Sequence, residues 1–343
     1  MRVLVAMSGG VDSSVAAAML VAEGHHVVGA TMKLWGGTSD TGCCSVADVD
    51  DARRVAQQLA ISHHVFNFSD DFDRHVVGPY VADHAAGRTP NPCIECNRHL
   101  KFDRLLARAD RLGFDAVATG HHARVTRERG GAWSLRRGAD PAKDQSYVLH
   151  MLAQPQLART LLPVGHLTKS EVRQRALALG LRTATKPDSQ DVCFISRSGG
   201  REKFLGERIP LRPARVVDME GARVGELPAV ELVTVGQRRG LGPAEPGGRR
   251  YVVAVDNPSA TVTVGPVDAL MVGELPVVEP VWVNGEPGAG ERLLVQMSAH
   301  GQPVPGRWSG GIVVVEEPVR RVAPGQSVVL YRDDAVVGGG LAG

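Results

Sequence analysis

The start of the chain limits the fold more than any other stretch. An apolar run, Val3–Met7, leads directly into Ser-Gly-Gly-Val-Asp-Ser-Ser over residues 8–14, and Asp12–Ala22 is helical in composition. A glycine-rich turn between a buried strand and a helix points backbone N–H groups at the helix N-terminus, where the helix dipole also favours an anion. The three serines of the loop add hydroxyl donors. These residues predict a phosphate-binding strand–loop–helix unit.

The loop differs from two common phosphate-binding loops. It lacks the Gly-Lys-Ser/Thr ending of a Walker A loop, and it lacks the Gly-x-Gly-x-x-Gly pattern of a dinucleotide site. It resembles the PP-loop, Ser-Gly-Gly-x-Asp-Ser, of enzymes that split ATP into AMP and pyrophosphate. Asp12 is a candidate to help hold Mg²⁺ on the leaving pyrophosphate. An ordinary glycine turn is the alternative, but motif, position and flanking elements all favour a nucleotide site.

Strand and helix patterns alternate through the first part of the chain. Apolar runs predict further strands at Val27–Met32, His64–Phe68 and Ala116–Thr119. Amphipathic spacing predicts helices at Asp48–Ala60, Phe72–His84 and Asn97–Leu112. A capping-box pattern at Thr168–Glu171 starts another helix, which ends at Gly180. This order predicts an α/β doubly wound parallel sheet.

The pattern of apolar residues and of glycine and proline changes after about residue 206. Short valine-rich runs separated by glycine and proline are typical of small barrels or sandwiches. A further boundary is predicted near Pro266–Gly273, which divides the chain into residues 1–205, a small central β-rich domain over 206–266 and a C-terminal β domain over 267–343. Gly338–Gly343 is interpreted as a frayed tail. The predicted strands are Leu232–Val235, Tyr251–Val255, Thr261–Val264, Ile312–Val315 and Val328–Tyr331.

Composition excludes some classes of protein. Lys+Arg is 39 and Asp+Glu is 37, so a histone-like nucleic-acid binder is disfavoured. Aromatic residues are only 4%, which argues against extended stacking on single-stranded bases. Local arginine clusters would suit the phosphates of a folded RNA, although a solvated surface explains many of them equally well. These clusters contain Arg124, Arg127, Arg129, Arg136, Arg137, Arg197, Arg201, Lys203, Arg208, Arg238, Arg239, Arg249 and Arg250.

The sequence predicts a cytoplasmic protein with reduced thiols. No stretch reaches the roughly 18 apolar residues that a membrane span needs. The N-terminal apolar run is too short for a signal peptide. The five cysteines are an odd number in a long chain without such a signal, which argues against a disulfide framework.

Two cysteine contexts are candidates for chemistry. Cys93 and Cys96 precede the predicted Asn97–Leu112 helix, whose dipole favours a thiolate. Cys96 is nearer to that helix and to two cations, so it is the better candidate nucleophile. Cys193 follows a polar loop and enters an apolar run. For Cys93 and Cys96, the alternatives are half of a zinc site or a thioredoxin-like pair. For Cys193, the alternative is a buried core position.

The order and spacing of several motifs identify a family. The chain closely resembles the bacterial tRNA-specific 2-thiouridylase family, MnmA, over nearly its whole length. The motifs are residues 6–14, Thr89-Pro90-Asn91-Pro92, Cys96-Asn97, Ala118-Thr119-Gly120-His121, Lys143-Asp144-Gln145-Ser146-Tyr147, Asp188-Ser189, Cys193-Phe194-Ile195, Gly236-Gln237-Arg238-Arg239-Gly240-Leu241-Gly242 and Pro324-Gly325-Gln326.

The resemblance implies a role for many single residues. Cys193 would carry a persulfide and Cys96 would be the nucleophile, with a transient disulfide between them. ATP would be held by Ala6, Met7, Ser8, Gly9, Gly10, Val11, Asp12, Ser13, Met32 and Gly120. The target base would be contacted by Asn91, Pro92 and Cys93. tRNA would be contacted by His121, Lys143, Asp144, Gln145, Ser298, Ala299 and Gln326.

The resemblance also implies an architecture, a reaction and partners. The fold would be a PP-loop domain (adenine nucleotide alpha hydrolase-like), a small central β domain and a C-terminal β-barrel. The enzyme would use ATP and Mg²⁺ to thiolate the wobble uridine of tRNA, with glutamate, glutamine and lysine acceptors as substrates. A cysteine desulfurase or sulfur-relay protein would supply the persulfide.

Two departures from the family pattern are visible. The family usually has Asp at the position of Cys93, and it often has a basic–aromatic pair at Ser298 and Ala299, where His300 is a candidate replacement. Cys43 and Cys44 carry no functional interpretation. Two rival functions stay open from the residues alone. One is another PP-loop ligase, such as an amidating synthetase or argininosuccinate synthetase, and the other is a non-catalytic RNA-binding or redox-regulated protein.

Overall fold

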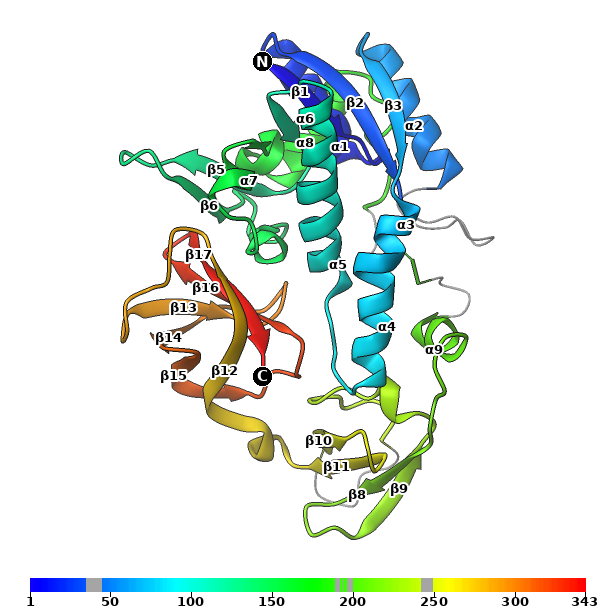
Figure 1. The fold of residues 1–343 in the computed structure, drawn as a ribbon, viewed down its shortest axis with the longest axis vertical. Coiled ribbons are helices and arrows are strands. Elements are labelled where there is room, and N and C mark those ends of the chain that lie inside the picture. The colour runs from blue at the N-terminus through cyan, green and yellow to red at the C-terminus, as the bar shows by residue number, and fades with distance from the viewer. Residues whose placement is uncertain (35–44, 189–191, 193, 196–199, 242–248) are drawn as a thin grey trace.

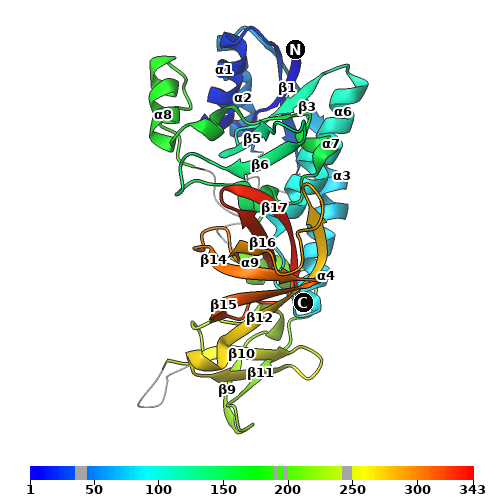
Figure 2. The same cartoon turned by 90° about the vertical axis from the view of Figure 1, so that its left-hand side faces the viewer.

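The computed structural model describes residues 1–34, 45–188, 192, 194–195, 200–241 and 249–343. Cys43, Cys44, Cys193 and Arg197 therefore lie outside the described residues. The molecule is elongated, with the N-terminal sheet at one end, a small β unit at the other and a β-barrel between them (Figures 1 and 2). Among the helices that the structure describes, none is both long and apolar enough to span a membrane.

The first domain contains the predicted parallel sheet, in the order β3–β2–β1–β4–β7. The side chains of β1 alternate between two cores: Val3 and Val5 pack beneath α1, α2 and α8, whereas Leu4 packs on the opposite face with Phe102 and Leu149. Helices therefore cover both faces of the sheet. The elements are β1 Arg2–Ala6, α1 Val11–Ala22, β2 His26–Lys33, α2 Val46–Gln58, β3 Ser62–Asn67, β4 Ala116–Ala118, β7 Thr160–Leu161 and α8 Lys169–Ala178.

Two long helical segments descend from this sheet beside the barrel (Figure 1). Each contains a stretch of π-helix in its middle. The first runs through α3 Ser69–Phe72, η1 Asp73–Val77 and α4 Gly78–Ala85. The second runs through α5 Pro92–Glu95, η2 Cys96–Arg104 and α6 Leu105–Arg111.

The second segment begins earlier than predicted. Asn91 is its N-cap, with Oδ1 accepting a 3.1 Å hydrogen bond from the Cys93 backbone N–H, and Pro92 is the first helical residue. The expectation that Cys96 is nearest to the helix N-terminus is therefore wrong. Cys93 lies in the first turn, and Cys96 lies in the second.

A hairpin that the sequence did not predict follows β4. Its strands are β5 Ala123–Arg127 and β6 Trp133–Arg137, and Arg136 pairs with Ala335 of the barrel. Arg124 and Arg136 both donate to Asp334, at 2.7 and 2.5 Å. The predicted basic stretch is thus partly neutralised within the protein. The other short elements of this part are η3 Ser146–Leu149, α7 Gln154–Leu157, η4 Pro163–His166 and α9 Gly200–Gly206.

The central unit is a four-stranded sheet in the order β10–β11–β8–β9. Its strands are β8 Ala214–Val217, β9 Arg223–Leu227, β10 Tyr251–Asp256 and β11 Thr261–Gly265. The strand predicted at Leu232–Val235 is wrong, because Val230–Leu232 forms a 3₁₀ turn, η5. The buried Glu231 explains this difference. Its carboxylate accepts from the backbone and guanidinium of Arg212, and its carbonyl oxygen lies 3.1 Å from His84 Nδ1, so this backbone is not available for a ladder.

The C-terminal strands close into a six-stranded barrel, because β12 pairs with both β15 and β17. The interpretation of Gly338–Gly343 as a frayed tail is wrong, since most of it belongs to the closing strand. A Cβ on Gly338 would lie 2.3 Å from the carbonyl oxygen of Val281, so glycine allows β17 to approach β12 closely. After η6 Val267–Leu270, the strands are β12 Met271–Trp282, β13 Arg292–Gln296, β14 Val304–Ser309, β15 Ile312–Arg320, β16 Ser327–Arg332 and β17 Ala335–Ala342.

Candidate active site

The loop between β1 and α1 has the geometry of a phosphate site. Gly10 is the N-cap of α1 and offers no side chain to the first-turn N–H groups, which remain for a ligand. Gly9 has φ 72°, and a Cβ there would lie 2.2 Å from the Asp48 carbonyl oxygen, so only glycine fits. Ser13 Oγ accepts from the Ser8 N–H at 3.2 Å and braces the loop. The loop therefore fits an ATP phosphate.

The other predicted ATP residues meet this loop. Met32 lies at the carboxyl end of β2, and Gly120 follows β4. A Cβ on Gly120 would lie 2.5 Å from the Ser13 backbone nitrogen, so glycine lets the chain after β4 contact the start of α1. The predicted residues thus gather at the carboxyl ends of three neighbouring parallel strands, where α/β sheets bind ligands.

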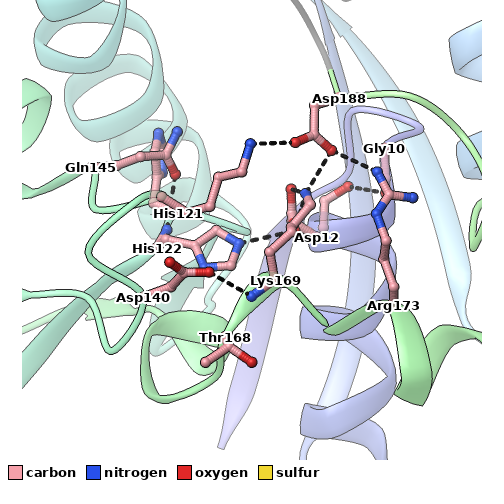
Figure 3. Close-up of polar contacts among 12 residues, drawn as sticks. Gly10, Asp12, His121, His122, Asp140, Gln145, Thr168, Lys169, Arg173 and Asp188 are labelled. Carbon is pink, nitrogen blue, oxygen red and sulfur yellow. Dashed lines mark hydrogen bonds and ion pairs between the residues drawn. The ribbon is translucent and has the colours of Figure 1, made fainter. Parts of the chain in front are cut away.

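Asp12, in the first turn of α1, is held by two basic side chains (Figure 3). Lys169 Nζ donates to its two carboxylate oxygens at 2.7 and 2.8 Å, and His122 Nε2 lies 3.0 Å from Oδ1. Burial acts to raise the pKa of Asp12, but the hydrogen bonds from His122 and Lys169 outweigh it and keep the pKa below its usual value. Asp12 is therefore a carboxylate that could hold Mg²⁺.

Asp188 joins a second group of cations to the same site (Figure 3). Its carboxylate accepts from Lys143 at 2.8 Å, Lys169 at 2.9 Å and Arg173 at 2.8 Å. Burial acts to raise the pKa of Asp188, but the hydrogen bonds from Lys143 and Lys169 lower it well below the usual range. Lys143, which the resemblance assigns to tRNA, thus lies beside the nucleotide loop.

Sequence reasoning missed several residues of this site. His122 directly follows the recognised motif that ends at His121, and Lys169 stands within the capping box that begins at Thr168. The capping box itself is confirmed, with Thr168 accepting from the Glu171 N–H. The signal for Lys169 was its position directly after that N-cap, which places it in the first turn of α8.

The loop that leads into the helix with the two cysteines faces the other domains. The Thr89 N–H donates to the Pro324 carbonyl oxygen at 2.8 Å, and Gln326 Nε2 donates to the Thr89 carbonyl oxygen at 2.6 Å. An open pocket of about 360 Å³ lies where this loop, the central unit and the barrel meet. Its lining is Thr89, Thr234, Val235, Met297, Arg320, Arg321, Val322, Ala323 and Gln326. Cys93 is half-buried and Cys96 is buried.

Other predicted tRNA residues mainly contact the protein itself. His121 is buried, with Nδ1 2.7 Å from Thr119 Oγ1, and burial, followed by the charge of Lys101, lowers its pKa well below the usual value. Asp144 binds Arg137 at 2.9 Å, and Gln145 Oε1 accepts from the His122 N–H at 2.9 Å. The Ser298 and Ala299 carbonyl oxygens accept from Gln296. Gln145 is therefore linked to Asp12 through His122, whereas Asp144 is linked to Ser298 and Ala299 through Arg137, which donates to Gln296 at 2.8 Å.

Three family models match the chain in succession. They are described as the tRNA methyl transferase HUP domain over residues 1–197, the tRNA methyl transferase PRC-barrel domain over 202–266 and the aminomethyltransferase β-barrel domain over 272–342. The first covers the parallel sheet and the nucleotide loop. The other two cover the central unit and the barrel.

Curated relatives match along almost the full length. The tRNA-specific 2-thiouridylase MnmA of Chloroflexus aurantiacus is 46% identical over 99% of this chain and 97% of its own. That of Mycolicibacterium smegmatis is 49% identical over 97% of this chain and 96% of its own. Among solved structures, NMN synthetase from Francisella tularensis is 19% identical with a TM-score of 0.34, covering 55% of this chain and 66% of its own.

Proposed function

The chain belongs to the tRNA-specific 2-thiouridylase family, whose members are tRNA-uridine 2-sulfurtransferases, and from this premise we propose its mechanism. The protein adenylates the C2 carbonyl oxygen of the wobble uridine with ATP and then replaces this oxygen with sulfur from a cysteine persulfide. The observation that carries the proposal is the loop from Ser8 to Ser13, with Asp12 and Gly120 at the start of α1. We also propose that the domains extend over residues 1–205, 206–266 and 267–343.

Adenylation solves a chemical difficulty. A uracil carbonyl oxygen is a poor leaving group, whereas AMP is a good one. The C2 oxygen attacks the α-phosphorus of ATP, and pyrophosphate leaves. The N–H groups at the start of α1 bind phosphate oxygens, and the Asp12 carboxylate would hold Mg²⁺, which neutralises charge on the leaving pyrophosphate.

Sulfur then reaches the activated carbon by one of two routes. In the first, the Cys96 thiolate attacks the inner sulfur of a Cys193 persulfide and expels hydrosulfide, which displaces AMP from C2. In the second, the terminal persulfide sulfur displaces AMP, and Cys96 then attacks the Cys193 sulfur and expels the thiouridine. Both routes leave a Cys96–Cys193 disulfide, which a dithiol reductant must open before the next turnover.

The start of the helical segment that carries Cys93 and Cys96 is proposed as the place where the target base is recognised. Asn91, Pro92 and Cys93 would contact the base, since they closely follow Thr89, which lines the pocket where the three domains meet. His121, Asp144, Gln145 and Gln326 would contact neighbouring parts of the tRNA, together with Ser298 and Ala299. The substrates would be the tRNAs for glutamate, glutamine and lysine in the cytoplasm, and a cysteine desulfurase or relay protein would supply sulfur.

Two measurements test this function. Nucleoside mass spectrometry of tRNA from a strain that lacks the protein should show loss of 2-thiouridine at the wobble position, and its presence at the normal level would contradict the assignment. With purified protein, ATP and tRNA should give AMP and pyrophosphate, and Asp12→Ala should abolish this while the fold remains. ADP and phosphate as the main products would contradict adenylation.

A further inference from the structure

Two lysines share one carboxylate beside the nucleotide loop. Lys143 Nζ lies 2.8 Å from Asp188 Oδ2, and Lys169 Nζ lies 2.9 Å from Asp188 Oδ1. Lys169 Nζ also forms an ion pair with Asp12 Oδ2 in the first turn of α1, at 2.7 Å. Lys169 is therefore in contact with the helix end that the proposed function assigns to ATP phosphates, and Lys143 is joined to it through Asp188.

We propose that Lys143 and Lys169 bind the pyrophosphate portion of ATP, and that Asp188 occupies their ammonium groups until the nucleotide arrives. This inference rests on the proposed function, in which pyrophosphate is the leaving group. A carboxylate and a phosphate oxygen accept the same charge-assisted hydrogen bonds from an ammonium group, so one can replace the other on these lysines. Pyrophosphate carries more negative charge than Asp188 and binds the pair in preference to it.

The burial of the two lysines fits this role. The Lys169 side chain is only 12% exposed, so its charge is little screened by solvent, whereas Lys143 is 42% exposed and can be reached from outside. The hydrogen bond that Lys143 donates to Asp188 is the main cause that raises the pKa of Lys143 above its usual value, so Lys143 stays charged. A buried and an open cation together can hold both phosphates of the leaving group.

Arg173 has a different part in the cluster. Its guanidinium donates to the carbonyl oxygens of Ala184 and Lys186 at 2.8 and 3.0 Å, as well as to Asp188. These backbone contacts make Arg173 the group that positions the segment before Asp188. Asp188 therefore keeps a partner when it releases the two lysines to pyrophosphate.

The inference changes the role that the family resemblance gives to Lys143. If Lys143 contacts tRNA alone, its removal weakens tRNA binding and leaves the affinities for ATP and pyrophosphate unchanged. If it binds pyrophosphate, its removal weakens both of those affinities when no tRNA is present. The two roles can therefore be separated by titrations of the full chain without RNA.

The test is calorimetric titration of the full chain with magnesium pyrophosphate, and with magnesium ATP, in the absence of tRNA. Lys143→Ala is expected to weaken pyrophosphate binding by about tenfold, the usual loss for one hydrogen bond to a charged group. Asp188→Asn is expected to tighten it several-fold, because the competing charge is removed. Arg223→Ala, which breaks an exposed pair with Glu226 in the central unit, is the matched control and should change neither affinity.

The opposite signs of the two changes distinguish ligand binding from a purely structural role. If both variants lose affinity together, or if Lys143→Ala binds pyrophosphate as the parent does, the inference is wrong. Filter binding of tRNA to the same variants separates a failure of this inference from a failure of the proposed thiolation function. A Lys143→Ala variant that loses only tRNA affinity overturns this inference and leaves the proposed thiolation intact.

Discussion

The ammonium group of Lys186 donates a 3.0 Å hydrogen bond to the carbonyl oxygen of Gly9, although the two residues are 177 positions apart in the chain. Lys186 also pairs with Asp48 at 2.6 Å and with Asp51 at 2.7 Å. Burial acts to lower the pKa of Lys186, but the two carboxylates outweigh it and raise the pKa above its usual value. A charged lysine thus fixes the glycine turn, and it ties the segment that leads to Cys193 to the nucleotide loop.

Lys186→Ala should weaken both the fold and ATP binding. It leaves two partly buried carboxylates without their lysine, so we expect unfolding free energy, measured by urea titration, to fall by about 2–4 kcal/mol. Because the folded pKa of Lys186 is raised, its contribution is present below the usual lysine pKa and is lost as pH rises through the folded value. Arg182→Ala, which removes a half-exposed partner of Asp51, is the control. Equal ATP affinities in the two variants would contradict a role for Lys186 in shaping the loop.

Gly339→Ala should destabilise the barrel. An ideal Cβ on this residue would lie 2.5 Å from the Val328 carbonyl oxygen and 2.9 Å from the His150 ring, so both the barrel and the first domain would have to move. We expect a loss of about 2–3 kcal/mol in unfolding free energy. Gly273→Ala on β12 is the control, because nothing lies within 4 Å of its ideal Cβ. Equal melting temperatures for the two variants would show that β17 is packed less tightly than the structure indicates.

Local patterns predicted much of the first domain. The strand–loop–helix start and the capping box are set by neighbouring residues, so the sequence alone could place them. The start of the second helical segment could also have been found, since Asn91 followed by Pro92 is a strong N-cap signal. The predicted helix start at Asn97 did not use this signal.

Tertiary contacts decided the rest. Lys169 meets Asp12 across 157 positions, and no local pattern can show such a pairing. The β5–β6 hairpin lacks a clear apolar period. Its Arg124 and Arg136 both pair with Asp334, which is about 200 positions away in the chain. The glycines of β17 resemble a flexible tail in sequence, because the close approach that requires them involves strands distant along the chain.

His150 should make stability depend on pH below neutrality. Its imidazole is buried, and burial is the main cause that lowers its pKa to about 4. Between about pH 6.5 and 4, His150 is therefore protonated in the unfolded chain but neutral in the folded chain. The free energy of unfolding falls as pH drops through this range, by up to about 1.4 kcal/mol per pH unit. His150→Asn keeps a donor for the Tyr147 carbonyl oxygen and removes the titration. Urea unfolding between pH 6.5 and 5 should show a shallower slope for this variant, and an unchanged slope would assign the dependence to other groups.

Arg238→Ala should weaken tRNA binding without changing ATP chemistry in the absence of tRNA. Arg238 is exposed in the loop before β10. A lost phosphate contact lowers affinity uniformly across tRNA sequences and reduces the slope of log affinity against log salt by about 1. Filter binding over a range of salt concentrations measures this slope. A variant with the parent slope and affinity would exclude Arg238 from the tRNA footprint.

The last prediction concerns which thiol of the pair Cys93 and Cys96 performs the chemistry. The helix dipole acts mainly within the first turn, so the observed start at Pro92 favours a thiolate on Cys93 over one on Cys96, contrary to the expectation from sequence. The family resemblance still favours Cys96, because it implies the nucleophile there and a carboxylate is usual at the position of Cys93. We therefore expect Cys96→Ser and Cys193→Ser each to abolish thiolation, and Cys93→Asp to keep much of it.

Peptide mapping after a single turnover without reductant identifies the attacking sulfur. We expect a Cys96–Cys193 disulfide, because only the thiol that attacks the persulfide-bearing cysteine ends in that bond. Cys93 lies one helical turn before Cys96 and could exchange into the product, so the mapping has to be repeated in the Cys93→Asp variant. If that variant is active and yields the same disulfide, the first-turn position of Cys93 does not make it the nucleophile. A Cys93–Cys193 disulfide in the parent, together with an inactive Cys93→Asp variant, would show that the dipole decides and that Cys93 is the nucleophile.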